Sequence, residues 1–279
     1  MKITFLIFYC LIALQGFSQL DPCKDWFTLN DFFLSEKIRE KLVKEIVISK
    51  SDKRDDEAFG KQHVIGIYRF DESGRLVLSE NFVQLSRRVD TASIEFVYAE
   101  NRLQRRIEKQ GSFNFSYSHK WINDSTYKEI KVDENMLDTN YVHEIKINKI
   151  TANEEKKTIY NSIGRPMKSI WTGKNLFNQI VYQKESYSRS LSFLVDSFAY
   201  SATQLQSRLE WNTIGRQKKT RWKFTYVEGY LDFLEKEEDG NLTFKYAFLY
   251  NENKLVKSIV MRDMLAKTIR IYKFKYDYY

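Results

Sequence analysis

Histidines, acidic residues and clustered basic residues are the side chains of this sequence that could do chemistry. The three histidines, His63, His119 and His143, could bind zinc or iron if folding brought them together. They form no close sequence pair and have no acidic residue at the usual ligand spacing, which favours ordinary strand histidines. No metal ion or other cofactor is therefore predicted.

The sequence carries none of the common catalytic motifs. It has no Gly-x-Ser-x-Gly elbow, phosphate-binding glycine loop, Cys-x-x-Cys pair or His-Glu-x-x-His helix. Glu237 and Glu238 stand together beside a lysine in an expected turn, which is typical of a solvated surface. The two members of a glycosidase pair converge in space rather than in sequence, so that alternative stays open. No catalytic residue is predicted.

The first residues predict export. Lys2 precedes an uncharged apolar run over 3–14, and Gly16 and Ser18 are the small residues that a signal peptidase reads. We expect residues 1–18 to be removed, leaving residues 19–279 in the periplasm, at the cell surface or in the medium. The apolar run is shorter than the about 20 residues that a spanning helix needs, so no transmembrane helix is expected.

Basic residues are the feature most directly related to a partner. Lysine and arginine number 45 against 37 acidic residues, which gives a net charge of +8. Alternation along a strand would place a cationic stripe on the side opposite Trp222 and Phe224. The stripe consists of Lys219, Arg221 and Lys223, and a second basic cluster consists of Arg102, Arg105 and Arg106.

Two interpretations of these basic clusters are open. In an exported protein they favour an anionic glycan or another envelope protein as partner, and no nucleic acid is expected. Alternatively, the charges only keep exposed strands soluble and prevent edge-to-edge pairing.

Hydrophobic periodicity predicts the fold. Aromatic and β-branched residues alternate with polar residues in many segments, among them 94–98, 113–117, 141–147, 220–226, 242–250 and 272–278. The segments between them are mostly of turn length, so the strands should be antiparallel. We predict a mainly β fold, an antiparallel meander of successive hairpins in a curved or rolled sheet. One short N-terminal helix is expected at about residues 28–42, within a single β-rich domain of residues 19–279.

Five stretches share a pattern that is typical of hairpin tips. Those at 70–75, 160–165 and 211–216 run aromatic residue, three turn residues, Gly and Arg. Those at 98–103 and 250–255 carry Asn before the basic residue instead. Glycine, and less readily asparagine, accepts the positive φ of a tight reversal. The predicted turn residues are Gly74, Asn101, Gly164, Gly215 and Asn253.

This pattern resembles the YD or RHS repeat of bacterial exported and cell-surface proteins. The stretch from Phe70-Asp71 to Gly74-Arg75 is the best match, and Tyr276-Asp277 repeats its start. The tips begin at residues 70, 98, 160, 211 and 250, at intervals of 28, 62, 51 and 39 residues, whereas a regular array keeps a nearly constant period. The resemblance implies a meander of hairpins in a structural or binding protein, and it implies no catalytic residue.

Three functions follow from these observations. The leading prediction is a non-catalytic exported envelope protein, a structural or binding scaffold built from β-hairpins. The first alternative is a polysaccharide-acting enzyme of the cell envelope. The second is an outer-membrane β-barrel, which the terminal Tyr278-Tyr279 suggests and the charges on most strands oppose.

Overall fold

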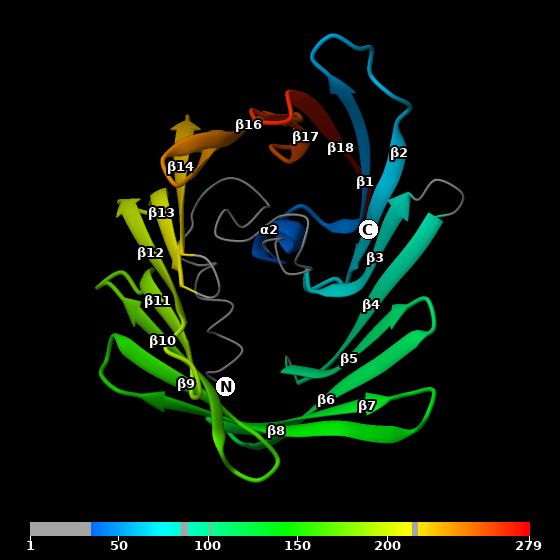
Figure 1. The fold of residues 1–279 in the computed structure, drawn as a ribbon. Coiled ribbons are helices and arrows are strands. Elements are labelled where there is room, and N and C mark those ends of the chain that lie inside the picture. Colours follow the sequence, from blue (N-terminus) through cyan, green and yellow to red (C-terminus); the bar gives the residue numbers. More distant parts are fainter. Residues whose placement is uncertain (1–34, 85–88, 101, 214–216) are drawn as a thin grey trace. The chain divides into compact units, whose positions relative to one another are not determined.

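The computed structural model describes residues 35–84, 89–100, 102–213 and 217–279 (Figure 1). The predicted signal peptide, the start of the predicted helix and the turn residues Asn101 and Gly215 lie outside these ranges. Within them, no helix is both long enough and apolar enough to cross a membrane.

The described residues form one short helix and 18 strands, which belong to a single hydrogen-bonded sheet. The elements in chain order are α2 (Ser35–Glu40), β1 (Val43–Arg54), β2 (His63–Phe70), β3 (Leu76–Gln84), β4 (Val89–Ala99), β5 (Arg102–Gln110), β6 (Phe113–Asn123), β7 (Thr126–Asp133), β8 (Asp138–Lys149), β9 (Glu154–Tyr160), β10 (Pro166–Lys174), β11 (Ile180–Tyr187), β12 (Phe193–Ser201), β13 (Gln204–Asn212), β14 (Lys218–Val227), β15 (Tyr230–Glu238), β16 (Asn241–Tyr250), β17 (Val256–Asp263) and β18 (Thr268–Tyr278). This confirms the predicted antiparallel meander.

The first and last strands pair with each other. Strand β1 is antiparallel to β18, with Ile46 opposite Tyr276 and Ile48 opposite Phe274, and its other side pairs with β2. From Glu45 to Lys50, β1 is paired on both sides, so this part of the strand offers no open edge for pairing with another chain.

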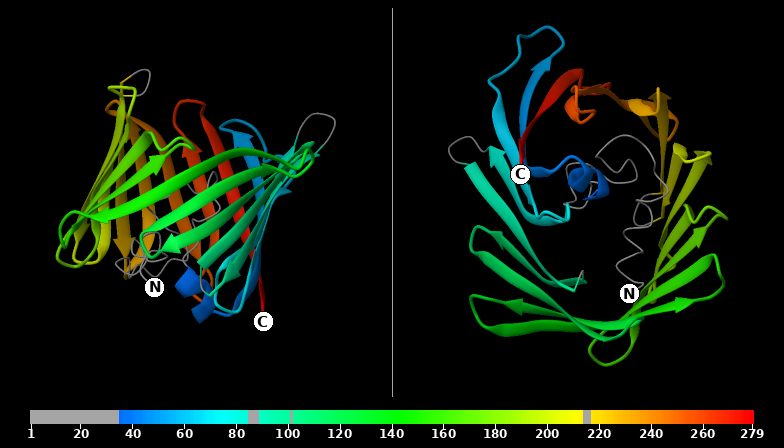
Figure 2. Two further views of the ribbon diagram at one scale, coloured as in Figure 1. Left: turned by 90° about the horizontal axis from the view of Figure 1, so that it is seen from below. Right: turned by 180° about the vertical axis from the view of Figure 1, so that it is seen from behind.

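The chain divides into two compact units. Of the described residues, unit 1 contains 96–220 and unit 2 contains 35–95 and 221–279. Strands β5 to β13 belong to unit 1, whereas α2, β1 to β3 and β15 to β18 belong to unit 2. Figure 2 follows the successive hairpins of each unit in two further views.

Unit 2 has an apolar core on one face of its strands. Ile46 and Ile48 are fully buried, and α2 packs on β1 with Ile38 also fully buried. On β18 the buried Tyr272 and Phe274 alternate with exposed lysines, which is the period of two expected for a strand with one covered face.

One sequence-based boundary is wrong. The helix is expected to reach about residue 42, but it ends at Glu40 because Leu42 has φ +52, outside the helical region. Strand β1 continues to Arg54 through a segment rich in charged residues. Its partner β18 pairs as far as Arg54 opposite Thr268, so backbone hydrogen bonding outweighs the polar composition.

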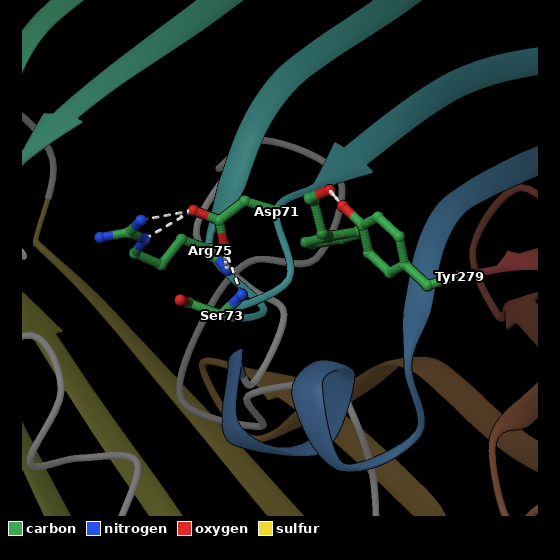
Figure 3. Close-up of polar contacts among 5 residues, drawn as sticks. Asp71, Ser73, Arg75 and Tyr279 are labelled. Carbon is green, nitrogen blue, oxygen red and sulfur yellow. Dashed lines mark hydrogen bonds and ion pairs between the residues drawn. The ribbon is translucent and has the colours of Figure 1, made fainter.

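The tip at residues 71–75 shows why the hairpin pattern folds as it does (Figure 3). The Asp71 carboxylate accepts hydrogen bonds through Oδ1 from the backbone amides of Ser73 and Arg75, at 3.0 and 2.9 Å. Its Oδ2 accepts a 2.7 Å bond from Arg75 Nε, while Gly74 supplies a φ of +74. An Asp or Asn that bonds its own following backbone amides stabilises such a turn.

The same turn recurs at residues 161–165, 175–179 and 251–255. In each, the side-chain oxygen of the leading Asn accepts a hydrogen bond from the backbone amide four residues later, at 2.8, 3.0 and 2.9 Å respectively. The residue before that amide has positive φ: +74 at Gly164, +62 at Asn178 and +64 at Lys254. The leading Asp or Asn is thus the shared determinant of these turns.

The prediction that Asn253 supplies the positive φ of its tip is wrong. Lys254 has the positive φ instead. The turn begins at Asn251, whose side chain accepts a hydrogen bond from the Leu255 amide, and the fourth residue of this turn is Lys254. At the tip after β4 the positive φ, +49, belongs to Glu100.

Candidate ligand-binding face

The two faces of the unit 1 sheet differ in chemistry. Successive side chains of a strand point to opposite faces, and the strand register therefore assigns each residue to one of them. One face carries His119, Glu129 and Asp196, and the other carries Lys156 and Trp171.

A row of lysine and aromatic residues crosses five strands of unit 1. Lys156 of β9 lies opposite Trp171 of β10, and Trp171 lies opposite Lys184 of β11. Lys184 is opposite Val195 of β12, which in turn is opposite Trp211 of β13. We call these five residues, together with Lys219, the lysine–aromatic row.

Each lysine of the row lies over an aromatic ring. The Nζ of Lys156 is 4.7 Å from the centroid of Trp171, and that of Lys219 is 5.7 Å from Trp211. The Nζ of Lys184 is 5.2 Å from Phe193, whose ring meets Trp211 edge-on at 5.2 Å. Cation–π attraction holds these ammonium groups beside the rings without neutralising them.

The row is partly exposed, and two of its lysines have no carboxylate partner. Trp211 is 39% exposed, and Lys184 and Lys219 are also exposed. No carboxylate of residues 35–84, 89–100, 102–213 or 217–279 forms an ion pair with Lys156 or Lys184. The exposed Trp211 ring and the half-buried Trp171 and Phe193 rings beside these cations are the side chains that an anionic ligand with apolar surface would contact.

The three basic residues of the predicted cationic stripe on β14 have different surroundings. Lys219 and Arg221 are exposed and Phe224 is buried at 3% exposure, so the strand alternates as expected. Lys223, however, is ion-paired with Glu237 of β15, and Lys219 belongs to the lysine–aromatic row. Trp222 is only half-buried and lies under Lys236 at 5.0 Å.

The predicted cluster of three arginines on β5 is divided between the two faces. Arg102 lies 4.9 Å from the Trp121 ring and Arg106 lies 4.2 Å from the Tyr117 ring. Arg105, at an odd position, projects to the other face and pairs with Glu134 at 2.7 Å. Arg102 also pairs with Asp124 at 2.8 Å, so much of this positive charge is already compensated.

Two of the three histidines flank one carboxylate. His119, Glu129 and His143 occupy matching positions on β6, β7 and β8, and His119 Nε2 is 3.1 Å from Glu129 Oε2. A carboxylate can only accept, so Nε2 carries the proton. Burial raises the pKa of Glu129, but the bond from His119 and the nearby charges outweigh it and hold this pKa below its ordinary value.

These groups do not form a metal site. His143 stacks on Tyr141 at 4.1 Å between centroids, while His63 lies in β2 of the other unit. Among the residues that the structure describes, no three His, Cys, Asp or Glu side chains are grouped so as to hold a metal ion. Burial, with the negative charge of Glu129 next, raises the pKa of Tyr141 to about 12.

A pair of carboxylates on the histidine face bears on the enzyme alternative. Asp196 and Glu210 are direct cross-strand neighbours, and Arg208 binds both, at 2.7 and 3.2 Å. Both carboxylates are thus engaged by one guanidinium, whereas the two carboxyl groups of a glycosidase flank the scissile bond of the substrate. Glu155 is different, since burial raises its pKa, and it lies three strands away from Asp196.

Sequence reasoning missed the lysine–aromatic row. Four of its five paired strands contribute a lysine or a tryptophan at an unremarkable position and β12 contributes Val195, and only the register aligns these residues. The sequence feature that could have indicated the row is the recurrence of lysine and tryptophan on nearby short strands.

Comparisons with known proteins give no family. No protein-family model and no curated protein matches this chain. Among solved structures, a porin-like protein from Bacteroides uniformis is 10% identical, with 85% of this chain and 97% of that chain covered and a TM-score of 0.43. A porin-like protein from Bacteroides vulgatus is 6% identical, covering 83% and 98%, with a TM-score of 0.29.

A third solved structure is a LolA superfamily protein from Nitrosomonas europaea. It is 11% identical, covers 86% of this chain and 91% of its own, and has a TM-score of 0.19. At these identities and TM-scores, the likenesses assign neither a family nor a function.

Proposed function

We propose that this chain is an exported, non-catalytic binding scaffold of the bacterial envelope that holds an anionic envelope component on its lysine–aromatic row. The observation that carries the proposal is the set of three lysines held over the half-buried rings of Trp171 and Phe193 and the exposed ring of Trp211. Of these lysines, Lys156 and Lys184 have no carboxylate partner among the described residues. Such uncompensated charge attracts anions and makes binding sensitive to salt.

Export is proposed because residues 1–18 contain an apolar run and small residues that are typical of a signal peptide. The expected product in the native host begins at Gln19. Mass spectrometry of the isolated protein measures this directly. Retention of Met1, or a lipid on Cys10 or Cys23, would contradict it.

The exposed charges on the strands of unit 2 favour contact of these strands with water rather than with lipid. Lys245 and Glu235 pair across β16 and β15 at 2.8 Å, with 48% and 35% of their side chains exposed. Arg262 and Asp55 form another exposed pair at 3.2 Å. A lipid-facing strand would have to bury such charges at considerable cost. The similarity to the YD or RHS repeat remains a prediction.

Retention of purified residues 19–279 on immobilised lipopolysaccharide, polygalacturonate and polyphosphate tests the binding proposal. We expect retention on at least one anion at low salt, and its loss as salt rises. Lys156→Gln, Lys184→Gln and Lys219→Gln combined should reduce that retention. The matched control is Lys257→Gln, Lys273→Gln and Lys275→Gln, which removes the same charge from exposed strand positions of unit 2. Absence of retention on all three anions, or equal loss in both variants, would contradict the proposal.

A further inference from the structure

The shape of the row restricts the kind of ligand it can hold. The row runs across the strands, and neighbouring strands lie about 4.8 Å apart, so its five paired residues extend over about 19 Å. Its members are exposed or half-buried. Small molecules are bound in concave pockets, whereas a row of side chains across five strands matches an extended polymer.

The aromatic members give the row flat apolar surface at two places. Trp171 and Trp211 are three strands apart, about 14 Å at the usual strand spacing. Tyr182 enlarges the first platform, because its ring lies over Gly173, two residues from Trp171 on the same face. The Glu154 carboxylate lies near the Tyr182 hydroxyl, which places polar groups at the margin of this platform.

The charges alternate with these platforms. Lys156 and Lys184 flank Trp171 on its two neighbouring strands, and Lys219 lies beside Trp211. A ligand that meets the row therefore meets cation, flat ring and cation in turn. Sugar rings have apolar faces that stack on aromatic side chains, and an acidic sugar adds a carboxylate that a lysine can bind.

We infer that the ligand is a linear acidic polysaccharide that lies across strands β9 to β13. Its sugar rings stack on Trp171 and Trp211, and its acid groups contact Lys156, Lys184 and Lys219. This inference rests on the proposed function and names the ligand class of the same row.

Four probes separate acidic sugar from other anions. Polygalacturonate carries both sugar rings and carboxylates, and its methyl-esterified form keeps the rings without the charge. Polyphosphate is a linear polyanion without rings, and vesicles of phosphatidylglycerol with phosphatidylcholine present anionic lipid. We expect polygalacturonate to bind most tightly, long chains better than short oligomers, because only long chains span both platforms.

The variants then assign each part of the row. Trp171→Ala with Trp211→Ala should weaken polygalacturonate binding by about tenfold or more, as for buried aromatic contacts in general, and leave polyphosphate binding within about twofold. Phe233→Ala, which removes an exposed ring from unit 2, is the control and should change neither. Urea unfolding of each variant verifies that the fold is kept.

The outcomes distinguish the inference from the proposed function. Row-dependent binding of polyphosphate or of anionic vesicles that equals or exceeds binding of polygalacturonate would overturn the inference and leave the anion-binding scaffold in place. An equal loss of polygalacturonate and polyphosphate binding in the tryptophan variant would do the same. Absence of row-dependent binding to every probe at low salt would overturn both.

Discussion

The ring of Tyr182 occupies the space that a side chain on Gly173 would need. A Cβ built on Gly173 would lie 2.2 Å from Cε1 and 2.5 Å from Cδ1 of Tyr182. The two residues are direct partners across β10 and β11, so the absence of a side chain on one lets the ring of the other lie flat on the sheet.

Gly173→Ala should therefore destabilise the protein by about 1 to 3 kcal/mol, since the Tyr182 ring has to leave its position. Urea unfolding measures the change. In the Tyr182→Ala background the same substitution should cost much less, because the clash is gone. Equal costs in the two backgrounds would show that Gly173 is needed for another reason.

The turn glycines should act through backbone conformation alone. Gly164 has φ +74 and nothing within 4 Å of a Cβ built on it, so a substitution meets strain without a clash. Gly164→Val should destabilise by about 1 to 3 kcal/mol and Gly164→Asn by clearly less, because Asn tolerates positive φ. Denaturant unfolding of both variants tests this, and equal effects would contradict a left-handed requirement at this turn.

Glu129 should make stability dependent on acid. Its pKa is lower in the folded chain than its ordinary value of 4.5, so the ionised carboxylate stabilises the fold. This contribution is fully present above about pH 4.5 and is lost as the pH falls through the lowered, folded-state pKa.

Below about pH 4.5, the urea midpoint of the Glu129→Gln variant should fall less steeply with decreasing pH than that of the wild type. Glu252→Gln, at an exposed turn position, is the matched control and should leave the slope unchanged. Parallel curves for the wild type and Glu129→Gln would mean that another carboxylate causes the acid sensitivity.

The two sides of β14 should differ in their contribution to stability. Replacing Lys219, Arg221 and Lys223 together by Gln should change the free energy of unfolding by less than about 1 kcal/mol, even with loss of the part-buried Lys223–Glu237 pair. Phe224→Ala should cost about 3 to 5 kcal/mol, because this ring is buried. Similar costs on both sides would contradict the assigned faces.

Local features of the sequence determined the strands and most of their turns. A period of two in apolar residues needs no distant partner to be recognised, and it identified β16 and β18 correctly. Likewise, the residue pattern around Gly74 and Gly164 predicts a turn, because the hydrogen bonds of this turn lie within five residues. Where Asn251 sets the frame, however, the backbone placed positive φ on Lys254, one position later than the residue type suggested.

Only the tertiary structure decided which strands and side chains are neighbours. Pairing of β1 with β18 joins residues more than 200 positions apart, as in Val43 opposite Tyr278, and overrides the polar composition near Arg54. The alignment of Lys156, Trp171 and Lys184 depends on the register of three strands, and a shift of one residue would send a side chain to the other face. Alternation is a property of one strand and can be recognised from local sequence. Register is set by turns, bulges and strand pairing together, so the sequence alone did not predict the row.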